Sequence, residues 1–185
     1  MSDSVDGRDV EVFDPDRLLA ILVEHDVLFV VIGGLAGNLR GSPVVTHDLD
    51  VCYARDRENL ERMARALGAM HARLRVAREE ADLAFPLDWR ALKLGDSFTL
   101  GTDFGPLDIL GTPSGTGGFN DLAPKATSFE IADDLIVKVA SIDDLIRMKR
   151  AAARTKDIAQ LEHLEALADE IARFSSEGLD PQQGE

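Results

Sequence analysis

The sequence predicts an α+β (mixed α/β) fold, in which a small mixed β-sheet is flanked by helices. Its first part predicts a helix, a strand and a second helix in succession. Its middle is rich in short apolar segments separated by turn residues, a pattern that is typical of β-strands. Its C-terminal part returns to the spacing of apolar residues that predicts helices. Strands and helices gathered in separate stretches indicate a sheet covered by a layer of helices.

Caps, breaks and apolar runs predict the elements of the first half. Asp14-Pro15 is typical of a helix N-cap and first helical residue, and apolar residues at helical spacing continue to about Glu24. Gly33-Gly34 ends an apolar run, which predicts a buried strand before it and a short helix after it. The ranges predicted after the first helix are a strand at 28–32, a helix at 35–39, a strand at 48–53 and a helix at 56–67.

The second half is expected to contribute most of the sheet and then two helices. Ser141 is suited to be an N-cap, because Asp143 and Asp144 follow it in the first turn. A break between the two helices is expected near 154–155. The predicted strands lie at 74–76, 97–101, 105–110, 129–131 and 135–139, the predicted helices at 88–92, 142–153 and 156–173, and a glycine-rich loop at 112–118.

The length of 185 residues favours one domain, or one domain with a small helical appendix. Apolar residues make up 45% of the chain and charged residues 29%, which is typical of a globular protein. We expect a flexible N-terminus at 1–12, a core at 13–140, a C-terminal helical segment packed on that core at 141–174, and a disordered tail at 175–185.

Charge and composition count against several classes of protein. The net charge of −14 argues against a protein that coats nucleic acid non-specifically, although it is compatible with a local basic site. No run approaches the roughly 18–20 apolar residues that a membrane span needs. The acidic segment 1–10 lacks the pattern of a signal peptide. The single cysteine, Cys52, excludes an intramolecular disulfide and fits the reducing cytoplasm.

Asp48 and Asp50 are the first candidates for chemistry. On a strand, side chains at i and i+2 point to the same face, while Leu49 between them points into the core. Two carboxylates held this close repel each other unless a proton or a cation relieves them. Mg²⁺ suits that role, because it takes one or two carboxylates and completes its shell with water and phosphate oxygens. Most Asp-x-Asp sequences are solvated surface carboxylates, but apolar neighbours count against that alternative here.

Asp108 is the candidate for a third carboxylate. It is the polar residue of the otherwise apolar strand segment 106–110, and a charge in such a place needs a partner. With two metal ions, a carboxylate site of this kind would clamp the attacking and the leaving oxygens of a phosphoryl displacement.

Gly33-Gly34 is the candidate for phosphate binding. Glycines between an apolar strand and a helix let backbone amides approach a phosphate, and the helix N-terminus adds a favourable dipole. The alternative is a tight strand-to-helix turn with no ligand. The segment has neither the G-x-G-x-x-G of a dinucleotide site nor the G-K-[ST] of a P-loop.

A cluster of cations lies near the C-terminus of this acidic chain. Its members are Arg147, Lys149, Arg150, Arg154 and Lys156. Cations at the end of a helix are expected simply to complement its dipole. The alternative is that Lys149 and Lys156 reach a triphosphate or the acceptor substrate, while Asp157 orients one of them.

Together, these residues resemble the nucleotidyltransferase superfamily with the polymerase-β-like core. Within it, the chain is similar to the bacterial toxin nucleotidyltransferases of the AbiEii and MenT kind. The superfamily pattern is an apolar strand, a Gly-Gly turn, a short helix, Asp-x-Asp on the next strand and a third Asp on a later one. Val44-Val45 departs from the pattern, since relatives often carry an arginine there. The matching segments are 29–34, 46–51, 107–109 and 140–157, within a resemblance that spans 28–167.

The resemblance implies a metal-dependent enzyme that moves a nucleoside monophosphate from an NTP to an acceptor hydroxyl and releases pyrophosphate. Mg²⁺ or Mn²⁺ would be held by Asp48, Asp50 and Asp108, which are also the implied catalytic residues, and Asp108 could help to deprotonate the acceptor. The implied nucleotide-binding residues are Gly33, Gly34, Thr46, Lys149, Lys156 and Asp157.

The acceptor stays open at this point. The toxin-like resemblance implies tRNA as acceptor and an antitoxin protein as partner. The acidic surface and the short chain suggest a small molecule, such as an antibiotic, as the alternative acceptor. A protein side chain is a further possible acceptor, and a non-catalytic nucleotide-binding module of the same fold is the alternative from outside the enzymes.

Overall fold

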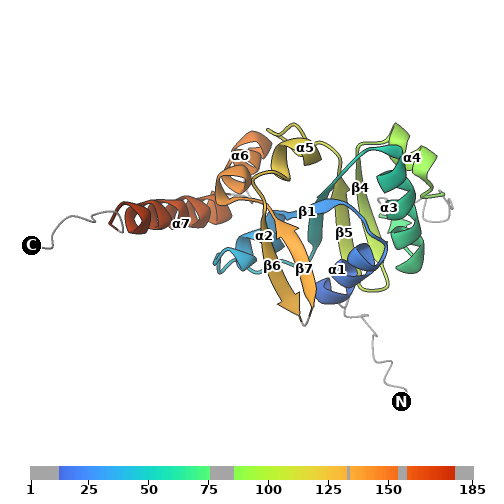
Figure 1. The fold of residues 1–185 in the computed structure, drawn as a ribbon, viewed down its shortest axis with the longest axis horizontal. Coiled ribbons are helices and arrows are strands. Elements are labelled where there is room, and N and C mark those ends of the chain that lie inside the picture. Colours follow the sequence, from blue (N-terminus) through green and yellow to red (C-terminus); the bar gives the residue numbers. More distant parts are fainter. Residues whose placement is uncertain (1–12, 76–85, 133, 154–157, 178–185) are drawn as a thin grey trace, which may run out of the picture.

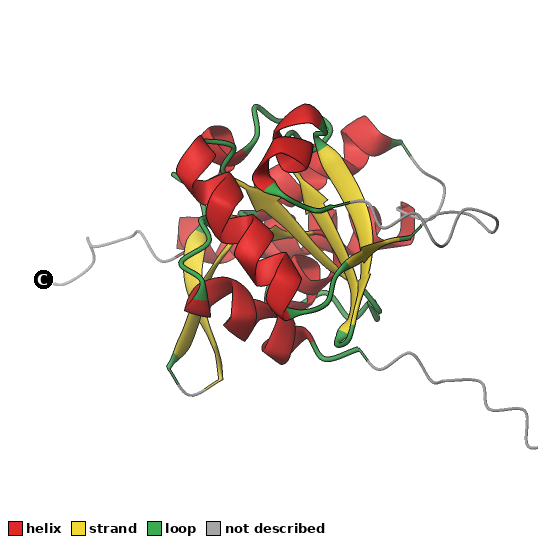
Figure 2. Ribbon diagram, turned by 90° about the vertical axis from the view of Figure 1, so that its right-hand side faces the viewer, coloured by secondary structure: helices red, strands yellow, loops and turns green. Residues whose placement is uncertain are grey.

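Seven strands and seven helices make up the part of the chain that the structure describes (Figure 1). The structure is a computed structural model, and it describes residues 13–75, 86–132, 134–153 and 158–177. The strands form one mixed sheet, and Figure 2 shows helices both in front of it and behind it. This is the mixed α/β fold that the sequence predicts.

Capping side chains fix where several helices begin. Asp14, Asp56 and Ser141 each accept a hydrogen bond from the backbone N–H three residues further on, as expected of N-caps. The helices are α1 (Pro15–Glu24), α2 (Gly33–Leu39), α3 (Arg57–Ala69), α4 (Trp89–Leu94), α5 (Phe119–Leu122), α6 (Ile142–Ala152) and α7 (Ile158–Glu177).

The sheet has the strand order β3-β4-β5-β2-β1-β7-β6. At its centre, β2 pairs antiparallel with β1 and parallel with β5, while β1 pairs in parallel with β7. The four residues of β1 are all buried, which fits a strand covered on both faces. The strands are β1 (Phe29–Ile32), β2 (Leu49–Tyr53), β3 (Arg73–Leu74), β4 (Ser97–Thr102), β5 (Gly105–Leu110), β6 (Thr127–Ala132) and β7 (Leu135–Val139).

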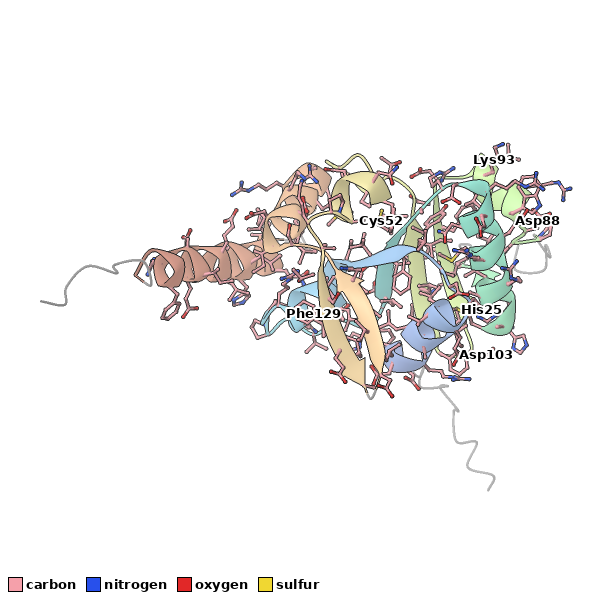
Figure 3. The ribbon with its side chains drawn as sticks, in the orientation of Figure 1. His25, Cys52, Asp88, Lys93, Asp103 and Phe129 are labelled. Atoms are coloured by element: carbon pink, nitrogen blue, oxygen red, sulfur yellow. The ribbon has the colours of Figure 1, made fainter. Side chains whose placement is uncertain are left out.

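Side chains from helices and strands form one hydrophobic core around the central strands. Cys52 of β2 lies in it and is completely buried. Its position is labelled in Figure 3. At the outer edge, the Arg40 guanidinium stacks 5.0 Å from the ring centroid of Phe129 and donates to Ala140 O at 2.9 Å. These contacts join the end of α2 to β6 and to the residue that follows β7.

Helix α7 packs on the body with its N-terminal half and projects away from it with its C-terminal half (Figure 1). Leu164 is completely buried, whereas Phe174 is 67% exposed. None of the helices in the described ranges combines the length and the apolar composition that crossing a bilayer requires.

The main local differences from the sequence prediction concern the ends of elements and one missed helix. Helix α2 begins at Gly33 and so includes the glycines, and Asp48 lies immediately before β2. The short helix α5 follows the glycine-rich loop, where no helix is predicted. Helix α7 continues to Glu177, slightly beyond the predicted start of the tail. The predicted flexible N-terminus at 1–12 and the predicted helix break near 154–155 lie outside the described residues.

Candidate active site

Three aspartates lie around one cavity because two neighbouring strands run parallel at the centre of the sheet. The register of β2 and β5 places Asp50 directly opposite Asp108. Asp48 immediately precedes β2. All three line the same cavity, so the structure brings together the carboxylates that the sequence singles out from two distant segments.

The Gly33-Gly34 turn lies against Asp50. Ile32, the last residue of β1, is the cross-strand partner of Asp50, so the turn begins beside that carboxylate. Gly33 has a φ of +66°, and a Cβ at this position would overlap Asp50 Oδ2. The backbone N–H of Gly34 donates a hydrogen bond to the same carboxylate. The turn therefore positions Asp50, and the Gly34 amide already has a partner within the protein.

Thr46 holds Asp48 from the loop that precedes β2. Its Oγ1 donates to Asp48 Oδ1 at 2.7 Å. Gly34 leaves room for this hydroxyl, since a Cβ on Gly34 would lie 2.5 Å from Thr46 Oγ1. The side-chain amide of Asn38, with its nitrogen facing both carbonyls, donates to Gly34 O at 3.1 Å and to Val44 O at 2.6 Å. Helix α2 and the loop are thus tied together next to the aspartates.

The electrostatics of the site are most visible at Asp50. Burial and then the charges of Asp48 and Asp108 raise the pKa of Asp50 to about 7, while the Lys149 charge and the Gly34 N–H act in the opposite direction. A carboxyl group with such a pKa is partly protonated at neutral pH. A bound cation would favour the ionised form and take the place of that proton.

The donor set suits a hard divalent cation. In the described part of the chain, no three Asp, Glu, His or Cys side chains converge closely enough to surround a metal ion by themselves. Mg²⁺ does not require such a cage, because one or two carboxylates suffice when water and phosphate oxygens complete its octahedron. The mutual repulsion that raises the pKa of Asp50 also shows that this cluster has an excess of negative charge. Carboxylates at Asp48 and Asp50 therefore fit Mg²⁺ or Mn²⁺.

The cavity has a volume of about 300 Å³. Aliphatic and thioether side chains form another part of its wall, among them Val44, Leu145 and Met148. A pocket with charged groups on one wall and apolar groups on another suits a ligand that has both kinds of surface. Every described residue that the sequence assigns to the site lines it: Gly33, Gly34, Thr46, Asp48, Asp50, Asp108 and Lys149.

The predicted cationic cluster divides between this cavity and surface ion pairs. Lys149 lines the cavity, where its charge lowers the pKa of Asp50. Arg147 instead forms ion pairs, and so does Arg150, which pairs with Glu165 at 2.6 Å. Arg154, Lys156 and Asp157 lie outside the described residues.

A network of ion pairs anchors α6, the helix that carries Lys149. Asp144, whose side chain is 4% exposed, accepts hydrogen bonds from Arg147 at 2.8 Å and from the Ser141 hydroxyl at 2.8 Å. Arg147 also donates to Asp121 at 2.7 Å. A hydrogen bond from the Gly117 N–H, and then the Arg147 guanidinium, lower the pKa of Asp121 to about 2. The start of α6 is therefore fixed to α5 and to the glycine-rich loop.

The cavity also has lining residues that the sequence does not mark as functional. Pro113 and Ser114 reach it from the glycine-rich loop, and Gln160 reaches it from α7. Nothing distinguishes Gln160 in the sequence, because a polar residue near the start of a helix is usually solvated. Its amide is buried where α7 packs against Gly37 of α2, a contact between distant segments.

A larger cavity, of about 810 Å³, lies between α6 and α7. Its charged lining includes Arg150 and Glu165, which pair with each other, and none of the three predicted catalytic aspartates reaches it. We place the candidate active site in the smaller cavity, since the chemistry of the lining is more informative than volume.

Solved structures of nucleotidyltransferases share the fold of this chain. The lincosamide antibiotic adenylyltransferase LnuA, solved with lincomycin, superposes with a TM-score of 0.57 at 11% sequence identity, over 85% of this chain and 99% of that one. The enzyme ANT(2″)-Ia, in complex with adenylyl-2″-tobramycin, superposes with a TM-score of 0.51 at 16% identity, over 88% of this chain and 95% of that one. No family model matches the sequence, and no curated protein sequence matches it either. At these identities the likeness establishes a nucleotidyltransferase fold.

Proposed function

We propose that this chain, which has a nucleotidyltransferase fold, is a metal-dependent nucleotidyltransferase. It would move a nucleoside monophosphate from an NTP to an acceptor hydroxyl and release pyrophosphate. The observation that carries this proposal is the gathering of Asp48, Asp50 and Asp108 around one cavity that Lys149 also lines.

The aspartates have separate tasks in this proposal. Asp48 and Asp50 hold Mg²⁺ or Mn²⁺, and the ion, when bound, neutralises charge on the phosphates and orients them. Asp108 takes the proton from the acceptor hydroxyl as its oxygen attacks the α-phosphorus. The bond between the α-phosphorus and the bridging oxygen breaks, and pyrophosphate leaves with that oxygen. The register that sets Asp108 opposite Asp50 supports this division, because it puts the base beside the metal-binding carboxylate.

The nucleotide would lie between the glycine turn and α6. Lys149 offers a positive charge to the triphosphate, and Thr46 positions Asp48. Gly33 and Gly34 contribute chiefly by keeping Asp50 in place, since the Gly34 amide donates to it. Lys156 and Asp157 remain part of the proposal as nucleotide-binding residues on sequence grounds.

A small molecule is the acceptor that the observations favour. An RNA acceptor calls for unpaired cations near the site, whereas Arg147 and Arg150 are paired with acidic side chains. The net charge of −14 acts in the same direction. Two of the proteins that share the fold were solved with lincomycin and with adenylyl-2″-tobramycin. A tRNA acceptor and an antitoxin partner, which the AbiEii/MenT-like sequence motifs suggest, form the competing proposal.

The test uses NTPs labelled at the α-phosphate, Mg²⁺, and two sets of acceptors. One set is a panel of lincosamide and aminoglycoside antibiotics, and the other is total tRNA. We expect label and the mass of one nucleoside monophosphate to appear on a small molecule, together with pyrophosphate. The Asp48→Ala variant should lose the transfer, while Asp143→Ala, which removes an exposed aspartate on α6, should keep it.

Three other outcomes would each change the proposal. Label on tRNA that depends on Asp48 would replace the small acceptor with the toxin-like reaction. NTP binding without pyrophosphate release on any acceptor would favour a non-catalytic nucleotide-binding module. Transfer that persists in Asp48→Ala would remove the aspartate cluster from the chemistry.

A further inference from the structure

Gln160 is a buried polar residue that the proposed chemistry leaves unused. It lies in the first turn of α7 and is 7% exposed. Its Nε2 atom is buried and has no hydrogen-bond partner within the described part of the chain. A buried donor without a partner destabilises the folded protein. Such a group in a native protein calls for an explanation, and a ligand that supplies the missing acceptor is one.

The position of Gln160 connects it to the nucleotide side of the cavity. A Cβ on Gly37 would lie 2.9 Å from Gln160 Nε2, so the amide packs closely against α2 at that glycine. Gly37 lies three residues after Gly34, on the same side of the helix. Gln160 also lines the cavity that contains Asp50 and Lys149. The amide is therefore within reach of a nucleotide whose phosphates lie at the aspartates.

The neighbours of Gln160 in the cavity wall indicate which part of a nucleotide would meet it. Val44, Met148 and Ala152 are apolar and line the same cavity. Phosphate oxygens favour charged donors, which Gln160 does not offer. A nucleobase instead combines apolar faces with edges of hydrogen-bond donors and acceptors, and a carboxamide offers one group of each kind.

We propose that Gln160 binds the base of the donor NTP through its side-chain amide and so determines which NTP the protein uses. This inference rests on the proposed nucleotidyl transfer. The tight packing against Gly37 restricts how the amide is oriented. An amide held in one orientation presents its N–H donor and its carbonyl acceptor at fixed places. It pairs with a base whose acceptor and donor lie opposite them, and it leaves a base with the reverse arrangement without hydrogen bonds. A buried polar group that is left unpaired by the wrong ligand is an effective source of discrimination.

The test measures the affinity of each of the four NTPs and of inorganic pyrophosphate in the presence of Mg²⁺ and the absence of acceptor. The full-length wild type is compared with Gln160→Met, which keeps the length of the side chain but removes the amide. Glu162→Met serves as the control, because it changes an exposed residue two positions further along α7. Melting temperatures of the three proteins are measured without nucleotide.

We expect the wild type to prefer one NTP by roughly tenfold, which corresponds to one satisfied buried hydrogen bond. Gln160→Met should lose this preference, keep its affinity for pyrophosphate and have a raised melting temperature, because an unpaired buried amide is gone. Glu162→Met should keep the preference.

An unchanged preference in folded Gln160→Met would overturn the assignment, as would a wild type with no preference. Equal weakening of all four NTPs and of pyrophosphate would give Gln160 a phosphate-binding role instead. A lowered melting temperature with unchanged preference would make it a structural residue. In each of these cases the wild type still binds NTP. Failure of the proposed function itself would show separately, either as a wild type that binds no NTP or, in the labelling experiment, as bound NTP without transfer to any acceptor.

Discussion

Among single residues, Gly33 is under the tightest steric constraint, and its neighbour is the carboxylate that matters most. Its φ of +66° is unfavourable for any side chain, and a Cβ would overlap Asp50 Oδ2. We expect Gly33→Ala to displace Asp50 and reduce kcat/KM for nucleotidyl transfer by about 100-fold or more. The cost in stability should be only about 1–3 kcal/mol, so the variant folds.

The control for Gly33→Ala is Gly68→Ala, which alters a glycine of α3 that has open space around its Cβ position. It should keep full activity and gain up to about 1 kcal/mol of stability. Steady-state kinetics and thermal unfolding of both variants decide the matter. Normal kcat/KM in Gly33→Ala would mean that the turn does not position Asp50.

Asp50 lowers the stability of the metal-free protein, and the effect depends on pH. Its pKa is raised from 3.8 to about 7 in the folded chain, so the folded protein holds the proton more tightly than the unfolded one. The stability that the protonated Asp50 allows is fully present below pH 3.8. It is lost as pH rises through about 7, because the folded protein must then hold an ionised carboxylate in this buried site. We expect Asp50→Asn, measured in EDTA, to raise the melting temperature by several degrees more at pH 8 than at pH 5.

Adding Mg²⁺ extends this prediction. The ion should raise the melting temperature of the wild type at pH 8 more than at pH 5, because it competes with the proton on Asp50. Asp50→Asn should respond less to the ion at both pH values. If the difference in melting temperature between variant and wild type is the same at pH 5 and pH 8, the raised pKa of Asp50 is wrong.

Residue patterns predict the aspartates of the site, but they do not predict which cations of α6 reach it, because that depends on contacts between different helices. Asp48, Asp50 and Asp108 stand out because charge in an apolar strand is costly and needs a purpose. No such pattern shows that Lys149 lines the cavity while Arg150 forms a surface ion pair. Its partner Glu165 lies on another helix, and only the packing of α6 against α7 brings the two together.

At the scale of elements, α6 decides where Lys149 lies, and the buried carboxylate of Asp144 holds α6 in place. Asp144 accepts from Arg147 and from the Ser141 hydroxyl. Removing its charge leaves Arg147 with one acidic partner instead of two. We expect Asp144→Asn to lower the free energy of unfolding by about 1–3 kcal/mol and to raise KM for NTP several-fold, with a smaller change in kcat.

The matched control is Asp143→Asn on the same turn of the same helix. Asp143 is exposed and stabilises the helix mainly through its interaction with the helix dipole. Its replacement should therefore lower the free energy of unfolding by less than about 1 kcal/mol and leave KM for NTP unchanged. Chemical denaturation and NTP titrations of both variants provide the comparison. Equal effects of the two substitutions would show that the network does not anchor α6.

Elements with strong local signals are the ones that the sequence predicts well. The caps Asp14 and Ser141 mark the starts of α1 and α6, and apolar runs mark the central strands. The short helix α5 has no side-chain cap, and it begins after Gly118, whose φ is +80°. Its single turn is stabilised by contacts with distant residues, such as the ion pair between Asp121 and Arg147, and a local pattern cannot report those.

For the molecule as a whole, topology builds the site from segments that are far apart in the sequence. A parallel pairing of β2 with β5, and not any local motif, sets Asp108 opposite Asp50. The sequence predicts that both strands exist, but their order in the sheet depends on how all seven strands pack. The same holds for Gln160, which reaches the cavity only because α7 folds back against α2.

The overall charge of the molecule makes a prediction about its acceptor. A protein that makes six to ten contacts with the phosphates of a nucleic acid binds it about 10³–10⁵-fold more weakly at 200 mM salt than at 50 mM. A small acceptor that enters the cavity displaces few counterions, and salt acts on it only by screening. With a net charge of −14 and with Arg147 and Arg150 already in ion pairs, we expect KM for the acceptor to change by less than about tenfold over this range. The measurement is the KM for the acceptor found in the labelling experiment, at four salt concentrations and constant Mg²⁺, with KM for NTP as the internal control. A steep rise of acceptor KM alone would show that the protein holds the acceptor mainly through its charge. For an anionic acceptor, the paired arginines would then have to release their acidic partners when it binds.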